Sequence, residues 1–312
     1  MPVFDPLPEA PTAGQLPLPL WGAQQFSVVD WPQDSFQIGY NSHTWLLADG
    51  DDLAVLKAVP ADQAVKFASG LTAAGIAELA GIPAGAPRPT LDGATVAVDG
   101  PWSWALLNYV RGTRTDASDA AQLAQAGRTL GRIHTALKDT PPLPETMVWT
   151  HMEWALAPMP FLDGLEWIQQ ALREVKEQLP DDLSQGVIHC DPRLTEFRFD
   201  GDTIGLIDWG EVMHGPHISD LAATVSFMDE GTDPKPFLSG WAETAPGSAD
   251  ELVYLPVLLK ARAALEGWVY ARRAAFGVDL GQLGEHNNHT LIERSRQNIL
   301  AAEALPRDFY RI

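Results

Sequence analysis

The chain has 312 residues, and 46% of them are hydrophobic, so there is enough apolar material for one large core or two unequal ones. The net charge of −20 is spread along the chain, which argues against nucleic acids and anionic membranes as partners, because both bind clusters of Lys and Arg. A single cysteine, Cys190, excludes an internal disulfide framework and a cysteine-based zinc site.

Residues 1–25 are rich in proline and predict either an extended, poorly ordered arm or a strap across the surface. They lack the basic start of a signal peptide. No apolar run approaches the roughly 18 residues that a membrane span needs. We therefore expect a cytoplasmic protein.

Residues 26–109 alternate short β-rich runs with turns. The runs FSVV, HTWLL and LAVLKAV, with the acidic turn ADGDD between the last two, predict antiparallel strands. Residues 62–79 have helical spacing and stop before Gly81 and Pro83. TVAV and WALLNYV then read as two further strands, so this region predicts a small lobe of mixed α and β structure.

Residues 110–312 change to helical periodicity, beginning after the short YVRGTRT segment. Apolar residues recur every third or fourth position over residues 119–137, 165–179, 251–276 and 290–305. Between the second and third of these helices lies a predicted hairpin that carries Asp191 and Asp208. The second lobe is therefore expected to be larger and mostly helical.

Asp191 and Asp208 each follow a short apolar run, and a hairpin between them would bring the two carboxylates together. A phosphoryl-transfer site needs this pair: one acid takes the proton of the attacking hydroxyl, and the other holds the Mg²⁺ that bridges the nucleotide phosphates. Mg²⁺ is suited by carboxylate and phosphate oxygens. The pair thus indicates phosphoryl transfer.

The segment from Gly186 to Ala222 resembles the aminoglycoside phosphotransferase and choline kinase family. That family's pattern is His-Gly-Asp, four residues, Asn, then Ile-Asp-Trp or Ile-Asp-Phe, then Asp-Leu-Ala; here HCD is followed by LIDWG and DLA. The resemblance covers about residues 26–276. It implies an α+β, bilobal, protein-kinase-like fold and transfer of the γ-phosphoryl group of ATP or GTP to a hydroxyl of an aminoglycoside-, choline- or homoserine-like acceptor.

The same resemblance implies roles for residues of this segment. Asp191 would be the catalytic base and Asp208 a ligand of Mg²⁺. His189 and Asp220 would support the structure. His189 would do so by hydrogen bonding to backbone, and Asp220 as an N-cap-like acid that opens the helix DLAATVSFM and helps to hold the loop.

Lys57 is a charged residue inside the apolar run LAVLKAV. It would either face solvent on the outer face of an edge strand or turn into a cleft; we favour the cleft, where the resembling families use a lysine for the α- and β-phosphates. The stretch QIGYNSHTWLL would cover the nucleotide, with Gly39 and Ser42 near the phosphates. The helix glutamate that fixes such a lysine has one candidate, Glu78 at the helix end, so this glutamate either reaches back or the pair is missing.

Glu196 stands where the family carries its metal-binding Asn. One interpretation keeps the kinase: a divalent cation accepts Glu196, which Mn²⁺ or Ca²⁺ tolerates better than Mg²⁺. In the other, Arg193 or Arg198 pairs with Glu196 and fills the metal position, which leaves a catalytically silent module that binds a ligand or partner.

The remaining candidates lie around this segment and in the helical half. Cys190 occupies the family's glycine position and is expected to be a buried bystander, because a thiol nucleophile needs a His partner in space. Core packing accounts for most of the Trp residues, with a cation–π box for an ammonium group as the alternative. Glu266 and Trp268 are candidate acceptor contacts. Oligomeric state has no signature in the sequence.

Overall fold

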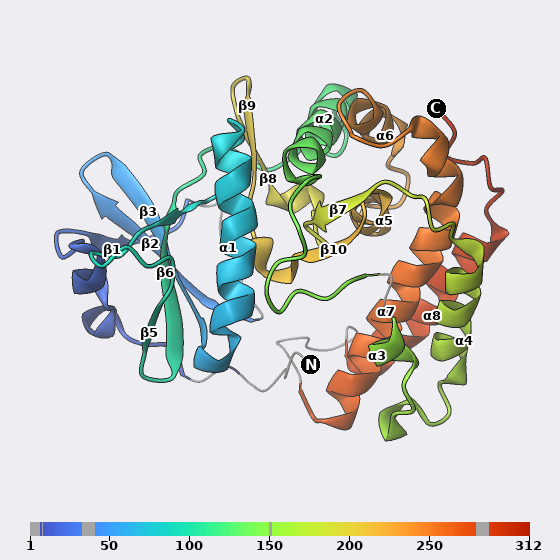
Figure 1. The fold of residues 1–312 in the computed structure, drawn as a ribbon, viewed down its shortest axis with the longest axis horizontal. Helices are drawn as coiled ribbons and strands as arrows, with labels where there is room; N and C mark the ends of the chain where they lie inside the picture. The colour runs from blue at the N-terminus through green and yellow to red at the C-terminus, as the bar shows by residue number, and fades with distance from the viewer. Residues whose placement is uncertain (1–6, 8, 33–40, 150–151, 279–286) are drawn as a thin grey trace.

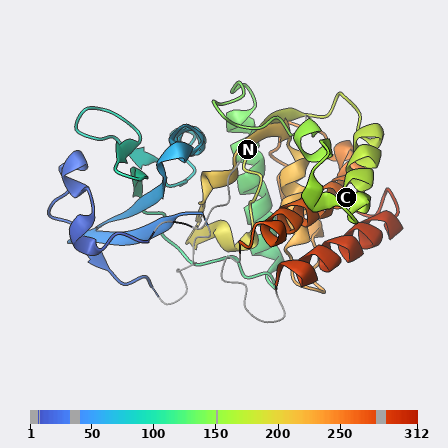
Figure 2. The ribbon, with the colours of Figure 1, turned by 90° about the horizontal axis from the view of Figure 1, so that it is seen from below.

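The computed structural model describes residues 7, 9–32, 41–149, 152–278 and 287–312. A β-sheet lies at one end of the molecule and a mainly helical body at the other, with helix α1 (Ala64–Leu79) between them (Figure 1). Seen from below, the sheet and the C-terminal helices again lie at opposite ends (Figure 2). The predicted α+β, bilobal fold is therefore confirmed.

The N-terminal lobe is built on an antiparallel sheet with the strand order β1-β2-β3-β6-β4, in which β5 also pairs with β6. Its strands are β1 (Ser27–Val29), β2 (His43–Asp49), β3 (Asp52–Pro60), β4 (Pro87–Arg88), β5 (Ala97–Asp99) and β6 (Trp102–Asn108). Alternation along β3 buries Ala54, Leu56 and Ala58 on one face. Lys57 points to the other face, and because β3 is an inner strand, the edge-strand interpretation of Lys57 is wrong.

The proline-rich segment packs on this sheet. It forms two short 3₁₀ turns, η1 (Ala13–Gln15) and η2 (Leu18–Trp21). Leu16, Trp21 and Ala23 are buried in the apolar cluster of the sheet, and the Trp21 indole donates to the carbonyl of Arg88 at 3.0 Å. Over residues 9–25 the segment is therefore a strap, and the poorly ordered arm is wrong there because its large apolar side chains are removed from water.

Helix α1 contacts both lobes. Phe67 and Leu71 pack against residues of the sheet, whereas Ala73, Ala74 and Ala77 join the core of the helical lobe. At its midpoint a Cβ on Gly70 would lie 2.1 Å from the carbonyl oxygen of Trp209. An acidic side chain has no room at this point of the helix, because backbone of the other lobe already occupies the space beside Gly70.

The C-terminal lobe surrounds one large apolar core. Its helices are α2 (Ala120–Leu137), α3 (Glu153–Leu156), α4 (Glu166–Gln178), α5 (Ile218–Ser226), α6 (Lys235–Ala242), α7 (Leu255–Ala275) and α8 (Asn288–Ala304). The predicted helices match α2, α4, α7 and α8 closely, and the carboxylate of Asp119 caps α2 by accepting from the amides of Ala121 and Gln122. None of the described helices is both long enough and apolar enough to cross a membrane.

Four short strands place the two aspartates. β7 (Gln185–Ile188) pairs antiparallel with β10 (Met213–Pro216), and β8 (Phe197–Asp200) forms a hairpin with β9 (Thr203–Leu206). Asp191 follows β7 and Asp208 follows β9. The predicted hairpin therefore exists, but it lies between the aspartates: β7 turns to β10 for its partner, and Asp191 lies outside the hairpin.

Candidate active site

Two loops from the strand ends meet at the junction of the lobes. We call residues 189–193 the first loop and residues 207–211 the second loop. The buried His189 ring joins them, because its Nε2 lies 3.0 Å from the carbonyl oxygen of Ile207, and its ring centroid lies 4.8 Å from that of Trp209. His189 thus occupies the position of a residue that supports both loops.

Asp220, which lies in α5, anchors the first loop. Its carboxylate accepts hydrogen bonds from the backbone amides of His189, at 2.9 Å, and Cys190, at 2.7 Å, and lies 2.9 Å from Nε2 of His134. Burial alone would raise the pKa of Asp220, but the hydrogen bond and charge of His134, with the His189 contacts, lower it. The N-cap expectation is wrong: α5 begins at Ile218, and the Asp220 carboxylate is turned toward the loop instead of its own helix.

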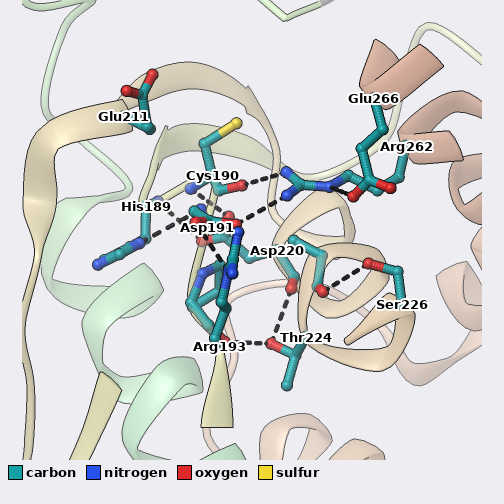
Figure 3. Close-up of polar contacts among 12 residues, drawn as sticks. His189, Cys190, Asp191, Arg193, Glu211, Asp220, Thr224, Ser226, Arg262 and Glu266 are labelled. Atoms are coloured by element: carbon teal, nitrogen blue, oxygen red, sulfur yellow. Dashed lines mark hydrogen bonds and ion pairs between the residues drawn. The ribbon is translucent and has the colours of Figure 1, made fainter. Parts of the chain in front are cut away.

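Asp191 is held by two arginines (Figure 3). Arg262 of α7 donates from Nη2 to its Oδ1 at 2.8 Å, and Arg193 donates from Nε to its Oδ2 at 3.1 Å. Arg262 also donates to the Cys190 carbonyl at 3.0 Å and to Glu266 at 2.9 Å. Burial opposes the charged form of Arg262, but the neighbouring Glu266 and Asp191 raise its pKa above the ordinary value. The Asp191 carboxylate is 28% exposed and opens to the cleft.

Asp208 pairs across the cleft with Lys57. Nζ of Lys57 lies 2.8 Å from Oδ1 of Asp208, whose side chain is 56% exposed, and the lysine charge lowers the pKa of this carboxyl. Glu78 does not reach Lys57: it accepts from the amide of Ala86 at 2.8 Å and from the side chain of Asn108 at 2.9 Å. Of the two alternatives for the helix glutamate, the missing pair is therefore the one observed, and Glu78 instead fixes the segment before β4.

Glu196 is buried, with 6% of its surface exposed. Burial, assisted by the charge of Asp208, raises its pKa to about 7. Its carboxylate accepts a hydrogen bond from the Thr195 hydroxyl at 3.1 Å. In the described part of the chain neither arginine forms an ion pair with this carboxylate, although the charges of both oppose the rise of its pKa. Arg193 is engaged with Asp191, and Arg198 donates to the backbone carbonyls of Thr195 and Phe197. The interpretation in which an arginine fills the metal position is therefore not supported by the contacts.

The carboxylates of Asp208 and Glu196 are the two that could hold a divalent cation here. Within the described part of the chain, no three His, Cys, Asp or Glu side chains form a ready-made metal cluster. Two carboxylates whose charges act on each other suit a cation such as Mg²⁺, which takes one or two carboxylates and completes its shell with phosphates and water. The residues present therefore fit such an ion when nucleotide phosphates accompany it.

Two cavities meet at these loops. The strand-side cavity, of about 230 Å³, extends between β3, β6 and Ile207, and the helix-side cavity, of about 310 Å³, extends toward α3 and α7. They share seven lining residues, which are Ser42, Lys57, Phe67, Asp191, Arg193, Asp208 and Gly210. Ser42 therefore lies at the junction, as expected for a residue near phosphates, whereas Gly39 falls outside the described residues.

The predicted acceptor contacts line the helix-side cavity, but they differ in character. Glu266 is already engaged by Arg262, and Trp268 is almost wholly buried, at 2% exposure. Sequence reasoning missed Arg262, which lies 71 positions from the aspartate it binds. The only local signal is the Arg-Glu spacing of four residues within a helix, which is a common surface pattern.

Cys190 behaves as a packed side chain. Burial raises the pKa of its thiol to about 12, and its Sγ lies 3.5 Å from Sδ of Met213. Its backbone adopts φ of 71°, a left-handed conformation that glycine accommodates without strain. This explains why glycine suits the corresponding place in the resembling family, and it gives the thiol no nucleophilic role.

Comparison with solved structures shows the same fold in small-molecule kinases. An amicoumacin kinase solved with AMP-PNP and Ca²⁺ is 16% identical to this chain, with a TM-score of 0.69. The match covers 92% of this chain and 90% of that chain. A choline/ethanolamine kinase family protein from Mesorhizobium loti is 14% identical, with a TM-score of 0.62 and coverage of 96% and 94%. The choline kinase LicA from Streptococcus pneumoniae is 14% identical, with a TM-score of 0.63 and coverage of 86% and 92%.

The sequence itself was also compared with curated proteins and with families. No curated protein matches it at a significant level. The profile of the phosphotransferase enzyme family matches residues 34–252, well over half of the chain and including both loops. The protein therefore belongs to the phosphotransferase enzyme family.

Proposed function

We propose that the protein transfers the γ-phosphoryl group of ATP or GTP to a hydroxyl group of a small molecule. The observation that carries this proposal is the meeting of two cavities at one set of polar residues. Lys57, Asp208 and Asp191 lie where the cavities join, so a nucleotide in one and an acceptor in the other would have their reacting groups side by side.

The strand-side cavity suits a nucleotide. Val55, Leu107 and Ile207 offer apolar surface for a base, and the backbone beside Asn108 and Tyr109 offers hydrogen-bonding groups at its edge. Lys57, which projects from the inner strand β3 into the junction, would neutralise phosphate oxygens. Ser42 would lie over the phosphates. AMP-PNP and ADP, which are named in two of the similar structures, agree with this assignment.

Asp191 is the candidate base. Its carboxylate is open to the helix-side cavity, so it would orient the acceptor hydroxyl and take its proton as the phosphorus–oxygen bond forms. Arg262 and Arg193 fix both of its oxygens and would hold the carboxylate in one orientation. His189 and Asp220 would keep the first loop in place without contacting substrate.

Asp208 and Glu196 are the candidate ligands of the divalent cation. Mg²⁺ or Mn²⁺ bound there would neutralise the charge on the nucleotide phosphates. Lys57 is paired with Asp208, and Glu196 is buried. In the proposed complex Lys57 would bind phosphate oxygens, and the carboxylates of Asp208 and Glu196 would hold the cation.

A catalytically silent binding module is the second candidate function. It is favoured by two observations: α1 offers Lys57 no glutamate, and Glu196 replaces the family's Asn. Such a protein would bind a ligand or partner in the same cavities without turnover. It shares with the kinase a soluble, cytoplasmic setting and a small-molecule site, so binding and turnover must be measured separately.

The test is a thermal-shift titration of the full chain with AMP-PNP and with Mg²⁺, Mn²⁺ or EDTA. A ligand at 100 times its Kd stabilises the native state by about 2.7 kcal/mol, so a metal-dependent rise in Tm is expected. Asp208→Ala should abolish the metal dependence, whereas Asp181→Ala, on the exposed surface, should retain it. The absence of any shift with ATP or GTP and either metal would overturn both nucleotide binding and the kinase.

ADP formation separates the two candidate functions. The kinase predicts ADP release from ATP or GTP that requires a divalent cation and Asp191. Nucleotide binding without any release, in the presence of a bound acceptor, would favour the silent module. A gain of turnover in Glu196→Asn would identify Glu196 as the residue that disables the site.

A further inference from the structure

Much of the lining of the helix-side cavity is apolar. Aromatic, methionine and leucine side chains form this apolar wall, and methionine side chains adapt to irregular ligands. The wall residues are Trp149, Met152, Trp154, Met213, Leu265 and Trp268. The indole Nε1 of Trp268 is buried without an acceptor in the described part of the chain. This wall offers apolar contact and little hydrogen bonding.

The acidic residues that line this cavity are already paired. Asp208 bonds to Lys57 at 2.8 Å, and Glu211 to Lys66 at 2.9 Å. Asp191 and Glu266 both bond to Arg262, at 2.8 and 2.9 Å. Among the described lining residues five are basic and four are acidic, so the cavity is not acidic although the chain carries a charge of −20. A ligand ammonium would find no carboxylate here that lacks a partner.

Three of the aromatic rings that line this cavity are already engaged by neighbouring side chains. The guanidinium of Arg193 lies over the Phe227 ring, with its Cζ 3.9 Å from the ring centroid. The Cζ of Arg262 lies 5.1 Å from the same centroid. Trp154 and Trp268 pack edge to face on each other at 5.0 Å, so they do not form the walls of an open box. The cation–π positions beside the first loop are taken by the protein's own arginines.

We propose that this cavity selects an uncharged hydroxylated compound with an aromatic or other apolar body. The inference deepens the proposed function and rests on it, since it names the acceptor class of the same site. A cationic acceptor would have to lose its hydration without gaining a counter-ion, or displace Arg262 from Asp191 and Glu266 and leave that guanidinium unpaired. An uncharged alcohol incurs neither cost, and its apolar body gains favourable contact with the apolar wall.

The reaction would then proceed at the acceptor hydroxyl. Its oxygen forms the new bond to the γ-phosphorus while the bond from that phosphorus to the β–γ bridging oxygen breaks. The electron pair of the broken bond leaves with the nucleoside diphosphate, and the hydroxyl proton passes to Asp191. The product is the phosphate monoester of the alcohol.

The test uses a matched series of small probes with the full chain. 3-Phenylpropan-1-ol is uncharged, 2-amino-3-phenylpropan-1-ol adds one ammonium to the same body, and choline and kanamycin are cations without that body. Calorimetric titration in the presence of AMP-PNP and Mg²⁺, repeated without them, gives each affinity. We expect the uncharged alcohol to bind at least about tenfold tighter than its amino analogue, and choline and kanamycin to bind more weakly still.

Two results would overturn the inference. One is tighter binding of the amino analogue, choline or kanamycin; the other is no binding of the uncharged alcohol at about 10 mM, where a Kd near 1 mM is readily measured. The thermal shift with AMP-PNP on the same samples keeps the tests apart. Loss of that shift counts against the proposed function, whereas the order of probe affinities tests the acceptor class alone.

Two variants with matched controls sharpen the test. Trp154→Ala removes part of the apolar wall and should weaken 3-phenylpropan-1-ol about tenfold, while Phe309→Ala, an exposed aromatic that lines neither cavity, should not. Arg262→Met releases Glu266 and should reverse the preference in favour of the amino analogue. The exposed Arg132→Met should leave the preference as it is. An unreversed preference in a folded Arg262→Met protein would contradict the charge argument.

Discussion

The first and second loops perform neighbouring tasks but are held in opposite ways. The first loop, with Asp191, is fixed from within the helical lobe by Asp220 and Arg262. The second loop is joined to the first by His189, but the side chain of its Asp208 is held across the cleft by Lys57, and that of Glu211 by Lys66 of α1. The contacts of Asp191 therefore do not depend on the distance between the two lobes, whereas the ion pair of Asp208 does.

The two loops also differ in how they accommodate a left-handed turn. In the second loop the turn residue is Asp208 itself, with φ of 70°, and aspartate tolerates this conformation comparatively well. In the first loop it is Cys190, with φ of 71°, one residue before the aspartate. The backbone of the first loop is therefore strained, and its buried anchors offset that strain, whereas the backbone of the second loop is less strained.

The largest expected effect separates the tasks of the two aspartates. Asp191→Asn should lower the rate of ADP formation by about 10² to 10⁴, the usual contribution of a general base, with the Kd for AMP-PNP and Mg²⁺ unchanged. Asp208→Asn should instead weaken metal-dependent nucleotide binding. Single-turnover kinetics and calorimetry measure both. Equal losses of affinity in the two variants would break the division of roles.

The next effect concerns the buried anchor of the first loop. Asp220→Ala should lower the free energy of unfolding by about 3 to 5 kcal/mol, because it leaves His134 and two loop amides without their partner in the core. Asp119→Ala, which removes only a partly exposed helix cap, should cost about 1 kcal/mol. Urea denaturation of both variants provides the comparison, and similar losses would show that the anchor is dispensable.

A third effect depends on pH and concerns Glu196, which lies between the loops. Since its pKa is raised from 4.5 to about 7 in the fold, the unfolded chain loses this proton first. The stability contributed by the protonated carboxyl is present below pH 4.5 and is lost as the pH rises through 7.

Glu196→Gln should therefore match the parent protein near pH 4 and exceed it by roughly 2 to 4 kcal/mol near pH 8, measured by denaturation without metal. Glu177→Gln, on the exposed face of α4, is the control. Parallel stability curves for Glu196→Gln and the parent protein would show that the buried carboxyl is already compensated.

The smallest effect concerns the strained turn of the first loop. Cys190→Gly should be more stable than Cys190→Ala by about 1 kcal/mol, although glycine has the smaller side chain, because alanine retains the cost of the left-handed conformation. Thermal unfolding of the two variants measures the difference. The reverse order would mean that packing of the side chain on Met213 outweighs the backbone strain.

Much of the fold could be predicted because its signals are local. Periodicity located α1, α2, α4, α7 and α8, and the β-rich runs located β2, β3 and β6. The choice between an arm and a strap for the proline-rich segment was left open, and the pairing of β7 with β10 was missed. Both depend on which distant surface covers an apolar residue or a strand edge, and no short window of sequence contains that information.

The candidate site divides in the same manner. Asp191, Asp208 and Lys57 were predicted from residue type and spacing, because a charged residue at the end of or within an apolar strand is unusual. Arg262 was not predicted, and neither was the steric reason why no acid stands at Gly70. A guanidinium 71 positions away and a backbone carbonyl of the other lobe become neighbours only after the helices have packed.

By itself, the sequence determined the order of the elements, the two lobes and the positions of the two aspartates, since helical and strand periodicity act over a few residues. The tertiary structure alone decided which charges meet: Lys57 pairs with Asp208 and Arg262 with Asp191, whereas Glu196 is buried near the charge of Asp208. Hydrogen bonds and ion pairs act over about 3 Å, so the chemistry of this site, including the charge it accepts, depends on packing between segments far apart in the chain.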